Sequence, residues 1–307
     1  MLTSGWPNES EFFFEVLIGG LLSGVMYALV AIGFVLIYKA SGVFNFAQGA
    51  MVFFAALTCV GMVDQFGFSL WLAVPLTIVV MIILGIAIER VVLRPLVNQP
   101  EITLFMATIG LAFFIEGLAQ LVWGAQVHKL ELPIEDVPSE YLMEKFNILV
   151  SQFDIMAAGV CALLVTSLAL LFSQTKVGRA LRAVADDHQA ALAVGIPLQR
   201  IWAVLWAVAG LVALVAGMLW GARNGVQFAL TFVALKALPV LILGGFTSMP
   251  GAIVGGLIIG ATEKMAEVYI GPLVGGGIEG WFPYVLALLF LLVRPEGLFG
   301  EKIIRRI

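Results

Sequence analysis

Long runs of apolar residues fill most of the chain, and short polar segments separate them. A helix needs about 20 mostly apolar residues to cross the hydrocarbon of a bilayer, and several runs reach that length. The pattern therefore predicts an all-α integral membrane protein with about eight or nine transmembrane helices, forming a single domain over residues 1–307. The predicted spans are 12–38, 42–62, 69–93, 102–123, 152–172, 201–222, 230–246, 250–270 and 281–293.

Three of these spans are less regular than the others. Residues 42–62 and 230–246 fit a re-entrant or broken helix as well as a full crossing, and 281–293 is short. Glycine-rich breaks at 41–50 and 243–256 each follow one long apolar helix and precede another. This arrangement would suit a duplicated, inverted unit of the kind found in many transporters.

The composition agrees with a membrane location. Hydrophobic residues make up 62% of the chain and charged residues 12%, whereas a soluble domain carries roughly 25% charged residues. These values exclude a soluble globular protein, a disordered chain and a nucleic-acid binder. Cys59 and Cys161 both lie in apolar runs, which predicts buried free thiols rather than a disulfide scaffold. Residues 1–11 contain no Lys or Arg, so no signal peptide is expected.

The basic residues predict the orientation of the chain, because cytoplasmic loops are enriched in Lys and Arg. Of the 16 basic residues, 11 flank one set of span ends and only three flank the other. The larger group marks the cytoplasmic side, which puts the N-terminus outside and the C-terminus inside for nine crossings. The 11 residues are Lys39, Arg90, Arg94, Lys176, Arg179, Arg182, Arg200, Arg294, Lys302, Arg305 and Arg306.

Two polar segments interrupt the apolar chain. Residues 124–151 are acidic and are expected to form an external loop. Residues 173–200 lie on the basic side and predict two short helices, 176–185 and 188–194, with Asp187 capping the second and Gly195 ending it. An amphipathic helix pair suits docking into a groove of another protein. A connector lying on lipid headgroups fits the same pattern equally well.

Each glycine-rich break carries its own polar or flexible residues. In SGVFNFAQGA, Asn45 and Gln48 lie within an apolar run, where their amides must brace neighbouring helices or line a pathway. In LGGFTSMPGAIVGG, a turn at 246–249 is expected to precede a helix that starts near Pro250. Gly251 and Gly255 then fall on one face, which favours close helix packing.

Charged residues within spans are costly, at least about 2.5–3.5 kcal/mol each, so they must face protein, water or a partner. Glu263, Lys264 and Glu267 are close in sequence and predict a local charge group near the outer end of one helix. Glu116 and Lys236 have no sequence neighbour of opposite charge. We expect both to face the protein interior, near each other.

No motif for catalysis or metal binding is present. His128 and His188 lie in the loops, and the chain contains no HExxH, no nucleophile elbow, no Cys-rich metal spacing and no P-loop. The sequence therefore predicts neither an enzyme nor a resident cofactor.

Several segments resemble the branched-chain amino-acid permeases of ABC importers, a family that also includes uptake systems for urea and short amides. They are GVFNFAQGAM at 42–51, TKVGRALRAVADDHQAALAVGI at 175–196, the block KALPVLILGGFTSMPGAIVGGLIIGATE at 236–263 and LSGVMYALVAIGFVLIY at 22–38. The first three occur in the family's order, which is far more specific than any one of them alone.

The resemblance implies a permease subunit in the bacterial inner membrane that works with other subunits. Its partners would be a second, different permease, two cytoplasmic ATPases that bind ATP and Mg, and a periplasmic substrate-binding protein. No cofactor and no nucleic acid are implied for this chain. The resemblance does not separate branched-chain amino acids from urea or amides as substrates.

The resemblance also assigns residues. Segment 173–200 corresponds to the family's coupling loop, where Asp187, or Asp186, takes the Glu position of an EAA-like pattern. The implied coupling residues are Gly178, Arg179, Asp187, Ala190, Ala191 and Gly195. The expected substrate-pathway residues are Asn45, Gln48, Gly49, Gly244, Gly245 and Gly251.

Two other functions fit parts of the sequence. An ion-coupled secondary transporter would use Glu116 or Glu263 as a proton or sodium site. A passive channel for a small neutral solute would need neither charge. Uptake that follows an ion gradient, or flux through the chain alone, would favour these alternatives.

Overall fold

The computed structural model describes residues 9–96, 99–186 and 188–300, and within these ranges the ordered elements are helices, with no strand beyond two isolated bridges. The predicted fold class is confirmed. The long helices are α1 (Glu9–Ser41), α2 (Gln48–Phe66), α3 (Leu70–Ala87), α4 (Glu101–Trp123), α6 (Gln152–Gln174), α9 (Leu198–Asn224) and α11 (Met249–Tyr269). The shorter ones are α5 (Glu140–Phe146), α7 (Lys176–Asp186), α8 (His188–Ala193), α10 (Val233–Gly244), α12 (Gly271–Val274) and α13 (Phe282–Val293).

Irregular turns extend two of these helices. A π-helical turn (Ile88–Leu93) and a 3-10 turn (Arg94–Leu96) continue α3, and a 3-10 turn (Phe228–Phe232) leads into α10. A further 3-10 turn, Ile278–Gly280, precedes α13.

Six helices are long and apolar enough to cross a membrane, and the number rises to seven if one bent pair counts as a single span. The bent pair joins Phe228–Gly244 to α11 at an angle of 112°. The predicted span 281–293 corresponds to α13, which has only 12 residues. The expected eight or nine crossings are therefore approximate, because that number counts the bent pair as two spans and α13 as one.

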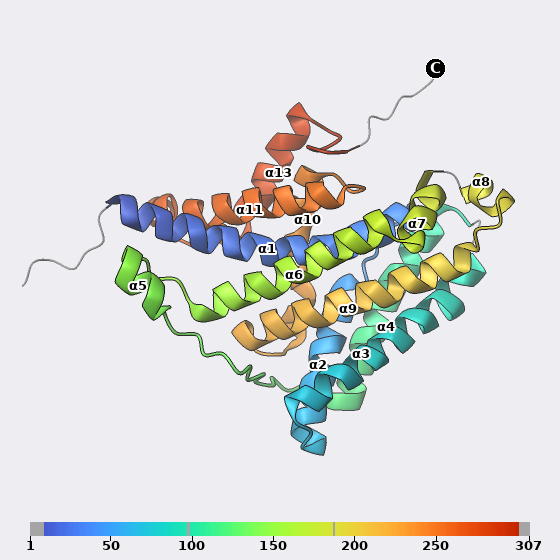
Figure 1. Ribbon diagram of the computed structural model, residues 1–307, viewed down its shortest axis with the longest axis horizontal. Helices are drawn as coiled ribbons and strands as arrows, with labels where there is room; N and C mark the ends of the chain where they lie inside the picture. The colour runs from blue at the N-terminus through green and yellow to red at the C-terminus, as the bar shows by residue number, and fades with distance from the viewer. Residues whose placement is uncertain (1–8, 97–98, 187, 301–307) are drawn as a thin grey trace, which may run out of the picture.

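Helices α1, α6, α9 and α11 run roughly along one direction, with α2, α3 and α4 grouped below them in Figure 1. Helix α1 contacts α6, α9 and α11, while α9 also contacts α2 and α3. The central helices α1, α2 and α9 are therefore largely enclosed by protein. Helices α3, α4, α6 and α13 expose large apolar side chains, including Ile83, Phe113, Leu163 and Leu292.

Glycines allow α1 and α11 to pack closely against each other. A Cβ atom added at Gly24 would lie 2.5 Å from the carbonyl oxygen of Gly256, and one at Gly20 would lie 2.7 Å from that of Gly260. Small residues let two helix backbones approach this closely. The spacing of four residues on each helix keeps the glycines on the facing sides.

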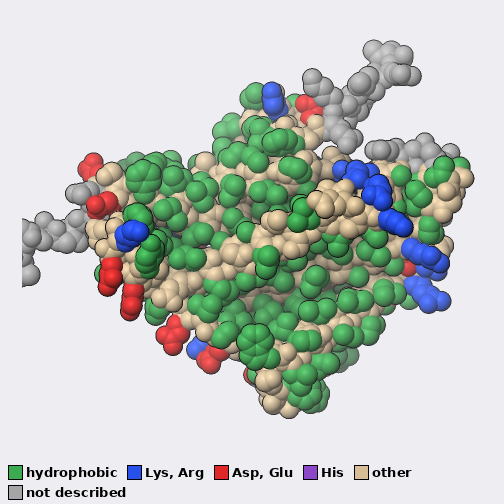
Figure 2. Space-filling view, in the orientation of Figure 1, with side chains coloured by type: hydrophobic (Ala, Val, Ile, Leu, Met, Phe, Trp, Pro, Cys, Tyr) green, Lys and Arg blue, Asp and Glu red, His purple; other side chains and the backbone are tan. Residues whose placement is uncertain are grey.

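The two ends of the molecule differ in charge. Acidic side chains gather at the end where α1 begins and α5 lies, and basic side chains gather at the opposite end, over α7 (Figure 2). This separation agrees with the predicted external loop at 124–151 and the cytoplasmic loop at 173–200. The backbone of His128 in the external loop pairs with that of Val226, just beyond α9, with N···O distances of 3.0 and 2.8 Å.

Candidate functional site

Residues 173–200, the loop predicted to be cytoplasmic, form the predicted helical hairpin, α7 followed by α8. Leu181 and Val184 of α7 and Ala191 of α8 are buried, so the hairpin rests on the bundle through an apolar face. Leu192 and Val194, in contrast, are 53% and 76% exposed. The end of α8 thus presents apolar side chains on the basic side of the molecule.

Backbone contacts hold α7 against the end of α6. A Cβ at Gly178 would overlap the carbonyl oxygen of Phe172, so only glycine fits this approach. Arg182 donates from its guanidinium to the carbonyl oxygens of Phe172 and Ser173, at 2.6 and 3.4 Å. Arg179 donates to the carbonyl oxygen of Gln174 at 3.3 Å. Both arginines satisfy carbonyls that the end of a helix leaves without partners.

Gly195 ends α8 in the predicted way. Its φ is +84°, in the left-handed region, and the N–H of Ile196 donates to the carbonyl of Ala191 at 3.0 Å. Such a turn favours glycine because it has no Cβ. Asp187 lies outside the described residues, as do the side chains of Asp186 and Ala190, so their predicted coupling roles stay predictions.

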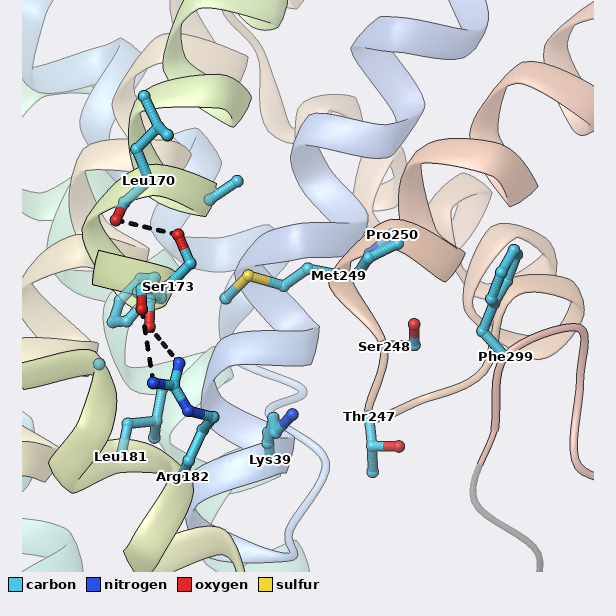
Figure 3. Close-up of a pocket in the computed structure, with 13 residues that line it drawn as sticks. Lys39, Leu170, Ser173, Leu181, Arg182, Thr247, Ser248, Met249, Pro250 and Phe299 are labelled. Carbon is cyan, nitrogen blue, oxygen red and sulfur yellow. Dashed lines mark hydrogen bonds between the residues drawn. The ribbon is translucent and has the colours of Figure 1, made fainter. Parts of the chain in front are cut away.

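A pocket of about 420 Å³ lies between the hairpin and the turn that joins α10 to α11. Figure 3 shows Arg182 directed at the end of α6 on one side, with Thr247 and Ser248 across the cavity. Lys39, near the end of α1, also lines it. The pocket therefore brings the hairpin, α1 and the α10–α11 turn to one place at the basic end of the molecule.

The first predicted break contains a fully buried amide cluster. Residues 42–47 connect α1 to α2 without helical structure, and Asn45 and Gln48 are both 0% exposed. The Asn45 amide donates to Oε1 of Gln48 at 3.4 Å, and Gln48 donates to the carbonyl oxygen of Ala209 on α9 at 3.5 Å. These contacts favour the bracing role over the pathway role, and neither side chain lines the pocket beside the hairpin.

Glycines shape the second break by close packing. Helix α11 starts at Met249 with Pro250 in its first turn, and the hydroxyl of Ser248 accepts from the N–H of Gly251 at 3.0 Å. A Cβ at Gly251 would overlap the carbonyl of Gly244, and one at Gly244 would overlap that of Gly251. The predicted turn and the predicted helix start are confirmed.

Two other predicted pathway glycines also make backbone contacts. A Cβ at Gly49 would overlap the carbonyl oxygen of Thr231, where α2 meets the turn before α10. Gly245 has a φ of +102° and lies against the backbone of Gly300. These positions shape the helix breaks, and their predicted part in a substrate pathway stays a prediction.

The charges within the spans pair differently from the prediction. Lys236 of α10 lies 3.4 Å from Oε1 of Glu263 on α11, and Tyr27 of α1 donates its hydroxyl to the same oxygen at 3.0 Å. Glu116 is half-buried on α4 and has no hydrogen bond or ion pair within the described part of the chain. The predicted proximity of Glu116 and Lys236 is therefore wrong, since the 112° bend turns Lys236 toward α11 instead.

The predicted ion pair between Lys264 and Glu267 is not formed. Glu267 does not pair with Lys264; it accepts from the backbone N–H groups of Gly277 and Glu279, at 3.1 and 3.0 Å. Lys264 is exposed. The carboxylate of Glu267 thus ties down the loop after α11, while Glu263 faces α1 and α10.

Sequence reasoning missed Tyr27, Trp220 and the Arg223–Asp154 pair. Tyr27 stacks on Trp220 of α9 with ring centroids 5.5 Å apart, and Arg223 donates to Asp154 at 2.9 Å. Aromatic residues are common in apolar runs, so nothing in the neighbouring sequence distinguished Tyr27 or Trp220. Asp154 at the start of one span and Arg223 at the end of another, both near the external side, could have suggested the pair.

The chain is similar to known permeases along nearly its whole length. Residues 16–294 match the family described as the permease component of branched-chain amino acid transport systems. The chain belongs to this family. It is 30% identical over 312 residues to the permease protein BraD of the high-affinity branched-chain amino acid transport system of Pseudomonas aeruginosa, covering 97% of this chain and 99% of BraD.

Two further known proteins are similar to this chain. The corresponding permease protein LivH of Escherichia coli is 28% identical over 311 residues, covering 96% of this chain and 98% of LivH. A solved chain of PsaBC from Streptococcus pneumoniae in complex with Fab matches 91% of this chain and 90% of its own length, with 14% identity and a TM-score of 0.49. The family and the long apolar helices together make this chain a multi-pass inner-membrane permease subunit.

Proposed function

We propose that this permease carries branched-chain amino acids inward as part of an ATP-driven importer, and that the α7–α8 hairpin is where an ATPase subunit docks. The observation that carries the proposal is the exposure of Leu192 and Val194 at the end of α8, in a hairpin anchored to the bundle. Exposed apolar side chains on a loop outside the predicted membrane spans are typical of a docking surface for a partner protein.

The anchoring contacts give the hairpin a route for transmitting force. Arg182 and the close approach at Gly178 join α7 to the end of α6, so a push on the hairpin moves α6 as well. The pocket between the hairpin and residues 247–250 puts the α10–α11 turn beside the same element. ATP-driven closure of the ATPases would move the hairpin, and this movement would pass directly to the adjacent bent helix pair. Such a bent pair can change between two arrangements.

The remaining subunits follow from the same proposal. Two cytoplasmic ATPases would bind ATP and Mg and hydrolyse ATP, because the sequence has no P-loop of its own. A second, different permease would complete the translocation path, and a periplasmic binding protein would deliver the substrate. BraD and LivH are permease proteins of branched-chain amino acid systems, which supports this substrate class for the present chain.

Replacing Gly195 tests the docking assignment. Gly195→Val forces a β-branched residue into a φ of +84°, which should distort the end of α8 beside the exposed Leu192 and Val194. We expect the variant to insert normally but to lose ATP hydrolysis stimulated by the liganded binding protein, measured on the full complex in liposomes.

Gly67→Val is the matched control. Gly67 also ends a helix with a positive φ, of +67°, and at both positions no atom lies within 4 Å of the added Cβ. The control sits at the external end of α2, so it carries similar backbone strain away from the hairpin. If the liganded binding protein stimulates ATP hydrolysis equally in Gly195→Val and Gly67→Val, the hairpin is not where the ATPase docks.

A further inference from the structure

A small polar cavity of about 290 Å³ lies among α1, α9, α10 and α11. It opens near the external end, because Arg223 and Asn224 at the end of α9 line it and the next residues pair with the external loop. Its other lining groups include Tyr27, Trp220, Lys236 and Glu263. Charges of both signs therefore meet two aromatic rings in one cavity.

The Lys236–Glu263 ion pair in this cavity is incompletely satisfied. Glu263 is 6% exposed, and its Oε1 accepts from both Tyr27 and Lys236, whereas its Oε2 is buried without a hydrogen bond to the described residues. Nε1 of Trp220 is also buried and has no partner there. A buried carboxylate with one unused oxygen is unfavourable, and so is an indole N–H without an acceptor.

Stability does not explain such a pair. Taking two charges out of water costs more than their attraction returns unless hydrogen bonds satisfy the remaining atoms, and apolar side chains of similar size are often at least as stable. Charged residues inside a membrane bundle commonly mark a substrate or ion pathway. The stacked rings of Tyr27 and Trp220 add an apolar wall beside the charges.

We propose that this cavity binds the charged head group of an α-amino acid zwitterion during its passage, an inference that rests on the proposed import function. The substrate ammonium group binds the carboxylate of Glu263, and the substrate carboxylate binds Lys236 and Arg223. The cavity, at about 290 Å³, is slightly smaller than the usual range for ligand sites, about 300–1,000 Å³, which suits the head group of a small ligand. Within the family's substrate range, paired charges suit a zwitterion, whereas neutral urea or an amide would not need them.

The geometry of α10 agrees with this assignment. Lys236 lies near the start of a 12-residue helix that follows a 3-10 turn and ends at a sharp bend. Transporter sites commonly lie at such discontinuous helices, where one bundle moves against another. A movement of α10 relative to α11 would separate Lys236 from Glu263, so release of the substrate can be coupled to the bend.

A paired substitution distinguishes a binding site from a structural ion pair. In Lys236→Met with Glu263→Met, both charges are replaced by apolar side chains, so a purely structural pair would be replaced without loss of function. We expect the complete complex to assemble and hydrolyse ATP, but the number of leucine molecules moved per ATP should fall at least about tenfold, as for the loss of one charge-assisted hydrogen bond.

The control is the ion pair between Glu89 and Arg94, whose side chains are 1% and 38% exposed, compared with 6% and 32% for Glu263 and Lys236. Both carboxylate oxygens of Glu89 accept from Arg94, at 3.3 and 3.1 Å. Glu89→Met with Arg94→Met should leave the leucine-to-ATP ratio unchanged. A lower ratio in the first double variant alone would support the cavity as a substrate site.

The outcomes separate this inference from the proposed function. If the wild-type complex moves no leucine, the proposed function fails, and this inference fails with it. If the wild-type complex moves leucine and the Lys236/Glu263 double variant shows the same ratio, only this inference is overturned. Should the double variant fail to assemble, Glu263→Gln decides, since it keeps the side-chain size: an unchanged ratio refutes the site, and a fall of about tenfold supports it.

Discussion

Two buried glutamates in different regions of the molecule, Glu89 and Glu263, differ in how many of their carboxylate oxygens accept hydrogen bonds. Glu89, at the cytoplasmic end of α3, is held through both oxygens by Arg94, five residues away. Glu263, in the external half of α11, uses one oxygen for two donors from distant helices and leaves the other without a partner in the described chain. Exposure is nearly equal at the two sites, so burial alone does not reveal a binding site. The unused oxygen and the adjoining cavity set Glu263 apart.

The largest expected loss of stability comes from removing only the basic partner of either ion pair. Lys236→Met and Arg94→Met each leave a buried carboxylate uncompensated, which should cost about 3–5 kcal/mol of stability. Thermal unfolding of the purified complex in detergent would measure it. We expect both single variants to be much less stable than the corresponding double variants. A single variant as stable as its double variant would show that the carboxylate finds water or another donor.

Tyr27→Phe should have the next largest effect. It removes the shorter of the two hydrogen bonds to Glu263 without changing the ring that stacks on Trp220. Hydrogen bonds to a charged group contribute about 1.5–3 kcal/mol, so stability should fall within that range. If the hydroxyl positions Glu263 for substrate, the leucine-to-ATP ratio falls as well. A fall in stability with an unchanged ratio would limit Tyr27 to a structural role.

Two glycine substitutions are expected to have the smallest effects on stability, and they compare the α1–α11 contact with the α3–α9 contact. A Cβ at Gly24 would meet the backbone of Gly256 on α11 at 2.5 Å, and one at Gly85 would meet the backbone of Trp206 on α9 at 2.7 Å. Overpacking of this kind costs typically about 1–3 kcal/mol, so Gly24→Ala and Gly85→Ala should destabilise the complex similarly.

Their effects on transport should differ. Gly24→Ala moves α1, and with it Tyr27, away from α11, whereas Gly85→Ala acts on α3 near Glu89. We expect only Gly24→Ala to lower the leucine moved per ATP in liposomes. Equal ratios in the two variants would mean that the contact between α1 and α11 does not control the cavity.

The cytoplasmic hairpin could be predicted from the sequence because its signals are local. The polar composition of 173–200, the C-cap at Gly195 and Pro197 beyond it lie within a few residues of the helices they define. Hydrogen bonds and φ angles at helix ends depend mainly on such neighbours. The hairpin boundaries therefore agree with the prediction to within one residue at each end.

The charged cavity could not be predicted in the same way. Lys236 and Glu263 are 27 residues apart, and Tyr27 and Glu263 are 236 residues apart. Sequence proximity suggested a local group around Glu263, and the lack of neighbours suggested Glu116 for Lys236. Neither predicted ion pair is formed, because the partner of a charge inside a bundle is set by which helices pack together.

The sequence by itself determined the membrane class, most of the long apolar helices, the sign of charge at each end and the α7–α8 hairpin. These features follow from hydrophobicity and helix-end chemistry, which act over one helix length or less. Only the tertiary structure decided which buried charges meet, which amides brace the core and where a cavity remains. Those outcomes depend on the 112° bend between α10 and α11 and on glycine contacts between distant helices, where backbone approach is set by packing rather than by neighbouring residues.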